Sequence, residues 1–179
     1  SEVFPEVPLD ENGFVQQMLK TTEGRLLLLD TVKHKKDEGT FCKKREMWLR
    51  NHLEESGSEN VYLFMHHPPF KIGIPALDRI RLQEGAQRIQ QIVNDFSNIK
   101  HLFFGHVHRP VSGSWQGIPF TALCGTNHQI LLDLATEDYL TYSHEPPAYS
   151  VILLESKQTT VHYQYYLDNF PYMKSSLNP

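Results

Sequence analysis

The chain has 179 residues, with 17 Lys and Arg against 21 Asp and Glu, so its formal net charge is −4 with its ten histidines neutral. A hydrophobic fraction of 40% and a charged fraction of 21% exclude a disordered tail, and the length suits one globular domain. The mildly acidic balance argues against a protein whose main task is nonspecific nucleic-acid binding. No apolar run approaches the roughly 20 residues of a membrane span. With only two cysteines we expect no disulfide framework and a reducing, cytoplasmic location.

The first hundred residues alternate between short apolar runs and amphipathic segments. The run RLLLLDT at residues 25–31 is typical of a strand buried on both faces, and VYLFM at residues 61–65 repeats the pattern. Strands separated by crossover helices favour a parallel sheet. We predict an extended lead-in at residues 1–12, strands at residues 25–31, 61–65 and 101–104, and a charged loop at residues 33–40. We predict helices at residues 42–55 and 83–96. The apolar stripe of the first helix contains Met47, Trp48, Leu49 and Leu53.

The second half of the chain has a different hydrophobic pattern, because its apolar runs are interrupted by polar residues. This pattern favours antiparallel strands with one solvated face. Tyrosines, acids and prolines gather at residues 138–147, which predicts an exposed loop. We predict a turn at residues 112–117 and strands at 118–123, 129–134, 149–154 and 159–166.

Two histidine motifs each follow a predicted buried strand: HHPP at residues 66–69 and GHVHR at residues 105–109. If these strands are parallel neighbours, both motifs emerge at the edge where ligands bind in open α/β sheets. In an extended segment His106 and His108 project to one side, whereas the adjacent His66 and His67 point opposite ways. Gly105 lets the backbone approach closely. Neutral imidazoles suit zinc, iron or manganese. The alternative is that each is a structural histidine at a strand end.

The two motifs together resemble those of the calcineurin-like metallophosphoesterases. The match is closest to the branch that contains class III cyclic nucleotide phosphodiesterases and glycerophosphodiesterases. Further pieces agree with it, namely LLDT at residues 28–31, WQGIP at residues 115–119 and GTNHQ at residues 125–129. The resemblance covers nearly the whole chain from about residue 14 onward.

The resemblance implies a fold and a chemistry. The fold class is α/β, part of a four-layer α-β-β-α sandwich with a mixed sheet, crossover helices and later antiparallel strands. Such enzymes hold two divalent metals (Mn, Fe or Zn), and a hydroxide between them attacks phosphorus. By position, His66, His106 and His108 are then metal ligands. His67 is the catalytic candidate that contacts the phosphate, and a loop-packing histidine is an equal alternative.

Two further residues are candidates for substrate binding on the same resemblance. Arg109 offers positive charge to a phosphate, although arginines beside such loops are more often exposed. His128 occupies a position that lines the substrate pocket in the glycerophosphodiesterase-like branch, with an ordinary turn histidine as the alternative. The resemblance also implies a small phosphodiester as substrate, without a nucleic-acid polymer or a membrane as partner.

The sequence departs from the family pattern because it has no Asp-x-His, no Gly-Asp-x-x-Asp and no Gly-Asn-His motif upstream of residue 66. We therefore expect residues 1–179 to be the C-terminal portion of one metallophosphoesterase domain. Three neutral histidines without a bridging carboxylate hold at most one metal weakly. Asp30 and Asp78 are the only acids that the sequence places near the sheet edge, and such acids are more often turn formers.

Three functions stay open at this point. The first is a metal-dependent phosphodiester hydrolase that acts on cyclic nucleotides, with glycerophosphodiesters as an alternative substrate. The second is a catalytically inactive fragment that binds only a metal or a partner chain. The third is an unrelated domain with structural histidines. Since a truncated sheet exposes an edge and an apolar face, we also expect a homo-oligomer, either a dimer or an exchange of elements.

Overall fold

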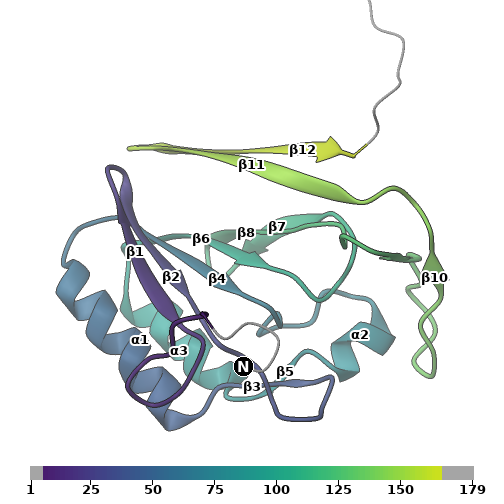
Figure 1. Cartoon of the computed structure of the whole chain (residues 1–179), viewed down its shortest axis with the longest axis horizontal. Coiled ribbons are helices and arrows are strands. Elements are labelled where there is room, and N and C mark those ends of the chain that lie inside the picture. Colours follow the sequence, from purple (N-terminus) through teal and green to yellow (C-terminus); the bar gives the residue numbers. More distant parts are fainter. Residues whose placement is uncertain (1–5, 167–179) are drawn as a thin grey trace, which may run out of the picture.

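A computed structural model describes residues 6–166, and its centre is a six-stranded sheet with the order β1-β2-β4-β6-β8-β7 (Figure 1). The four inner strands run parallel, and β1 and β7 pair antiparallel at the two edges. The predicted mixed sheet is confirmed. The strands are β1 (Gln17–Thr21), β2 (Gly24–Leu28), β4 (Val61–Met65), β6 (Ile99–Phe104), β7 (Val111–Trp115) and β8 (Ile118–Ala122).

Two crossover helices, α1 (Lys43–Ser56) and α3 (Ala86–Asp95), cover one face of this sheet (Figure 1). Each buries a stripe at helical spacing, with Leu49 and Leu53 in α1 and the isoleucines in α3. The apolar stripe predicted for the first helix is wrong at Met47, whose side chain is 61% exposed. The polar residues Arg45 and Glu46 are buried instead, because they pair with neighbouring elements.

A long hairpin of β11 (Ala148–Glu155) and β12 (Gln158–Tyr165) lies over the opposite face of the sheet (Figure 1). Residues of β11 alternate between half-buried and exposed, so Ile152 faces inward while Val151 and Leu153 face solvent. The described residues thus form three layers: helices, the mixed sheet and the hairpin. Solvation of the outer face explains why these strands read as interrupted apolar runs.

Several element boundaries differ from the sequence prediction. The predicted helix at residues 83–96 is shorter, because Gly85 has a left-handed backbone (φ 89°) and ends the short strand β5 (Leu82–Glu84). The predicted turn at residues 112–117 is mostly strand β7, with the turn confined to Gln116 and Gly117. Strand β8 is parallel to β6, so the second half is only partly antiparallel. Elements that were missed are β1, β3 (Gly39–Thr40), α2 (Pro75–Arg79) and β10 (Tyr142–Ser143), which pairs with the shortened β9 (Gln129–Ile130).

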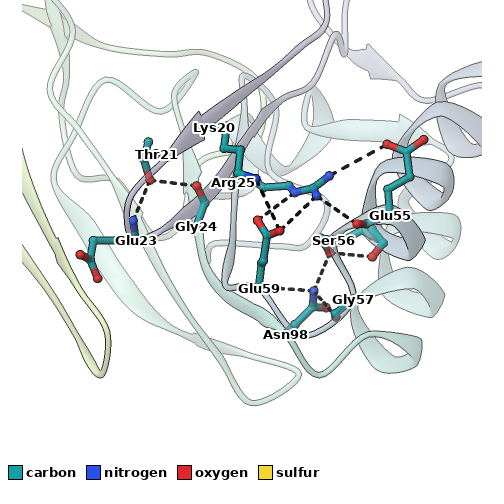
Figure 2. Close-up of polar contacts among 11 residues, drawn as sticks. Lys20, Thr21, Glu23, Gly24, Arg25, Glu55, Ser56, Gly57, Glu59 and Asn98 are labelled. Carbon is teal, nitrogen blue, oxygen red and sulfur yellow. Dashed lines mark hydrogen bonds and ion pairs between the residues drawn. The ribbon is translucent and has the colours of Figure 1, made fainter.

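The amino ends of β2, β4 and β6 are joined by a polar network (Figure 2). The Arg25 guanidinium donates from Nε to Glu59 Oε2 at 3.1 Å. The Asn98 amide donates to Ser56 Oγ at 2.7 Å and to the carbonyl oxygens of Gly57 and Glu59. These partners fasten the turn after α1 to the start of β6. Polar side chains at this end of the sheet are thus satisfied by other protein groups.

Within residues 6–166, none of the helices combines the length and the apolar character needed to cross a membrane. The cytoplasmic location therefore stays a prediction. The first five residues of the predicted extended lead-in, and the residues after 166, lie outside the part of the chain that the structure describes.

Candidate metal centre

The two histidine motifs meet at the carboxyl edge of the sheet. Strands β4 and β6 are parallel neighbours, and the last residues of both, Met65 and Phe104, are partners in register. The chain continues from them into the two motifs, so one ring nitrogen each of His66, His67 and His106 lies within 4.8 Å of the others. This juxtaposition is the one expected from adjacent parallel strands.

His106 and His108 line the same cavity, and the chain between them forms a turn, not an extended segment. The predicted ligand His108 lies outside the group of three histidines with ligand spacing, which contains His67 in its place. His106 and His108 both have a left-handed backbone, with φ 68° and φ 49° respectively. Val107 lies between them, fully buried, and its N–H donates to the Gly105 carbonyl oxygen at 2.7 Å. The extended geometry predicted from the sequence is therefore wrong here. Each left-handed L-residue costs about 1–2 kcal/mol, and strain of this kind clusters at functional sites.

His106 has the clearest features of a metal ligand. Its Nε2 is buried and has no hydrogen-bond partner among the described residues. Burial, followed by the nearby His67, His66 and His108 rings, lowers the pKa of His106 to about 3. The imidazole is thus neutral at physiological pH, with a ring nitrogen directed at no protein group. A divalent metal requires this neutral donor, and binding one would satisfy the unpaired atom.

His66 stands beside His106, with ring centroids 5.2 Å apart. Its pKa falls to about 4, because the ring is largely surrounded by protein and lies near His67 and His108. His66 is nevertheless exposed to solvent, unlike the buried His67 beside it. A Cβ on Gly105 would come within 3.1 Å of His66 Nδ1, so the missing side chain there lets the ring lie against the backbone.

His67 is buried and held by protein groups on both ring nitrogens. Its Nδ1 lies 2.8 Å from Thr31 Oγ1, and its Nε2 lies 3.0 Å from the Asp37 carbonyl oxygen. Since a carbonyl only accepts, Nε2 carries the proton and Nδ1 accepts from the Thr31 hydroxyl. This arrangement favours the loop-packing alternative, and the catalytic role of His67 stays a prediction.

His108 is oriented by the segment that carries His128. Its Nδ1 donates to the His128 carbonyl oxygen at 2.9 Å, which leaves Nε2 as the nitrogen that can bind a metal. The two rings lie 4.4 Å apart, and the Tyr142 ring meets His128 edge-on at 4.8 Å. A Cβ on Gly125 would approach His108 Nδ1 to 2.6 Å, so this glycine makes room for the ring.

All five of these histidines line one cavity of about 480 Å³. The remaining wall includes lysines of the loop after β2 and the side chains of Leu140 and Tyr142. A second, more apolar cavity of about 400 Å³ lies on the hairpin side, and it shares His66, His106 and His108 with the first. The three predicted metal ligands are thus accessible from both sides.

Other residues singled out from the sequence are engaged elsewhere. Arg109 donates from a terminal guanidinium nitrogen to the Ile130 carbonyl oxygen at 2.7 Å, and it lines neither of these cavities. Asp30 accepts from Arg45 at 3.2 Å and from two backbone N–H groups. Asp78 accepts from the N–H groups of Ile72 and Gly73. Among residues 6–166, the cluster with ligand spacing contains histidines alone.

Comparison with known proteins identifies relatives of the chain. No family model matches the chain. It is 36% identical over 165 residues to a probable cyclic nucleotide phosphodiesterase of Rhodopseudomonas palustris, an alignment that covers 90% of this chain and 60% of that relative. It is 29% identical over 161 residues to a probable glycerophosphodiester phosphodiesterase of Arcobacter nitrofigilis, with 90% and 59% covered. These relatives confirm the resemblance to the calcineurin-like metallophosphoesterases.

A solved structure shares the fold of the chain. A dimetal phosphatase from Danio rerio superposes with a TM-score of 0.52 over 64% of this chain and 50% of that one, at 16% identity. The chain spans about 60% of the length of the two curated relatives it matches. Together with this resemblance, the histidine cluster indicates a site for a divalent metal.

Two features of the site are not predicted from the sequence. Thr31, the partner of His67, was noted only as the end of a strand, although the LLDT motif contains it. Lys33 and Lys36 were assigned to a charged loop, and nothing in their spacing showed that the loop folds back over the histidines.

Proposed function

We propose that the complete protein is a metal-dependent hydrolase of small phosphodiesters, with cyclic nucleotides as the first substrate class. The observation that carries this proposal is the buried, unpaired Nε2 of His106 among histidines from two strand ends. A bound divalent ion supplies Lewis acidity and a water whose pKa is lowered toward neutrality.

The histidines divide into holding and positioning groups in this proposal. His66, His106 and His108 hold metal through ring nitrogens in this proposal. Burial lowers the pKa values of His66 and His106, which keeps these two imidazoles neutral. The carbonyl oxygen of His128 keeps His108 in one tautomer. His67 positions the loop after β2 through its two hydrogen bonds.

Two observations favour cyclic nucleotides over glycerophosphodiesters. The Rhodopseudomonas palustris relative, whose name refers to cyclic nucleotides, has the higher identity of the two over equal coverage of this chain. The ring of Tyr142 lines the histidine cavity beside His128, and an aromatic wall gives a nucleobase a surface for stacking. A glycerophosphodiester offers no planar group to such a wall.

A direct assay tests this function. The full-length protein, loaded with Mn²⁺, is expected to hydrolyse bis(p-nitrophenyl) phosphate and cyclic AMP, and to hydrolyse glycerophosphocholine more slowly. Hydrolysis should stop with a chelator and return with added Mn²⁺. Absence of hydrolysis in a sample that elemental analysis shows to contain metal would contradict the proposal.

A second candidate is a chain that binds metal without hydrolysing a phosphodiester. It is supported by the all-histidine cluster of residues 6–166, which includes no carboxylate that could bridge two ions. This candidate predicts that the 179-residue chain retains about one Zn²⁺ after desalting, with no turnover of either diester. Turnover by that chain alone would exclude it.

We also propose that the chain self-associates. Exposed apolar side chains on the outer face of the hairpin, Tyr149, Val151 and Leu153, support this idea. Light scattering coupled to size-exclusion chromatography should show a mass of at least two chains at high concentration. A single-chain mass across the accessible concentration range would contradict it.

A further inference from the structure

A lysine-rich loop forms one wall of the histidine cavity. This lysine loop, residues 32–38, contains three lysines against two acids, which leaves it positive while its histidine is neutral. Lys33 and Lys36 both line the cavity of about 480 Å³, together with the five histidines of the site. Positive side chains therefore face the same space as the candidate metal ligands.

His67 fastens the lysine loop to the floor of the site. Its two ring nitrogens bind Thr31 Oγ1, just before the loop, and the Asp37 carbonyl oxygen, near its end. The buried ring lies against Gly39, where a Cβ would come within 2.6 Å of His67 Cγ. A loop held at both ends by one buried side chain keeps its lysines over the cavity, so less conformational entropy is lost when a ligand binds.

The two lysines differ in how their charge is satisfied. Lys33 Nζ lies 3.0 Å from Glu38 Oε1, and that hydrogen bond, with a smaller contribution from Lys36, holds the pKa of the Glu38 carboxyl below its usual range. The Lys36 side chain is exposed and makes no hydrogen bond or ion pair with residues 6–166. Asp37, the acid in the same wall, offers its carbonyl oxygen to His67.

We propose that Lys36 is a substrate-binding residue, whose ammonium group binds a non-bridging oxygen of the phosphate in the histidine cavity. The inference rests on the proposed function, because it assumes that the cavity receives a phosphate. A lysine suits this task as a compact point charge on a flexible stem. Arg109, the cation expected here from the sequence, is occupied by Ile130 instead. Lys36 supplies the charge that Arg109 does not.

Titration of inorganic phosphate by calorimetry tests this role without requiring turnover. We would compare wild type with Lys36→Met, which keeps the stem and removes the charge, with Lys36→Arg, and with Lys35→Met as the matched control. Lys35 is exposed in the same loop but does not line the cavity. Lys36→Met should weaken phosphate binding by about 5-fold, which is the range of a partly exposed ion pair. Lys36→Arg and Lys35→Met should stay within about 2-fold of wild type.

A salt series and a metal determination complete the experiment. The difference between wild type and Lys36→Met should vanish near 1 M salt, where the Debye length is about 3 Å. Equal losses in the Lys35 and Lys36 variants, or no loss in Lys36→Met, would overturn the proposal. Metal content measured on the same samples tests the proposed function separately, because the comparison of the two lysines holds whether or not metal is bound.

Discussion

The two ends of the central sheet differ in how they treat polar side chains. At the amino ends of β2, β4 and β6, the amide of Asn98 and the guanidinium of Arg25 find protein partners at hydrogen-bond distance. At the carboxyl ends of the same strands, His106 keeps a buried ring nitrogen without one. Among the buried polar atoms of residues 6–166 that lack a partner, His106 Nε2 lies within the histidine cluster, and this position identifies the carboxyl end of the sheet as the place for a ligand.

Backbone geometry repeats the contrast. The turns before β2 and β4 place their positive φ values on glycines, Gly24 and Gly57, whereas the segment after β6 places them on His106 and His108, which have side chains. Such strain persists only where the surrounding structure enforces it, as the buried Val107 does here. Variants in the polar network at the amino end should therefore change stability without changing metal binding, whereas loss of His106 at the carboxyl end should change metal binding.

The largest effect should come from His106→Ala. Loss of a direct ligand should weaken Zn²⁺ binding by at least about 100-fold, which exceeds the usual cost of changing an outer-shell partner. Competition with a chromogenic chelator measures this affinity. His162→Ala, on the exposed hairpin strand β12, is the control and should leave the affinity unchanged. Equal Zn²⁺ affinities in the two variants would show that the site lies elsewhere.

Asn98→Ala should produce the opposite result. It leaves the Ser56 hydroxyl and two carbonyl oxygens without a donor, so the free energy of unfolding should fall by about 2 kcal/mol. Urea denaturation with a chelator present measures the loss. Zn²⁺ affinity of the folded variant should equal that of wild type, and a drop in affinity would break the separation between the two ends.

Variants of His67 and of its partner Thr31 distinguish a positioning role of His67 from a catalytic one. If His67 positions the lysine loop, both His67→Ala and Thr31→Val should lower the free energy of unfolding, by about 1–3 kcal/mol each, because each leaves a buried partner unpaired. Both should also raise the KM for the diester more than they lower kcat. If Thr31→Val kept wild-type KM and kcat while His67→Ala lost kcat, His67 would have the catalytic role.

Per pH unit, the smallest effect is the pH dependence of stability at His101, which lies on β6 and does not line the histidine cavity. Burial lowers the pKa of His101 to about 4, below the ordinary value near 6.5. Between these values the unfolded chain binds more protons, so stability falls as pH drops from about 6.5 to 4. His101→Gln, in the presence of a chelator, should reduce that slope by about 1 kcal/mol per pH unit. An unchanged slope would contradict this assignment.

The sequence predicted the parallel core and the meeting of the two histidine motifs, because both follow from short buried strands and the order of elements. It could not predict the left-handed turn at His106 and His108, since the buried Val107 and the His128 carbonyl oxygen that hold this turn act through tertiary packing. It also missed β1, whose polar and half-buried residues carry a weak alternation. The lysine loop is held at the site by the buried ring of His67, whose Nε2 donates to the Asp37 carbonyl oxygen. The sequence could not predict this contact, because the two residues are far apart in the chain.

The central claim is that the histidines at the carboxyl edge of the sheet hold a divalent metal. Crystals soaked in Zn²⁺ and measured at the zinc absorption edge test it most directly. We predict an anomalous-difference peak about 2.0–2.1 Å from Nε2 of His106, within reach of His66 or His108. Peaks only at other positions, with the cavity empty at full Zn²⁺ saturation, would contradict the account.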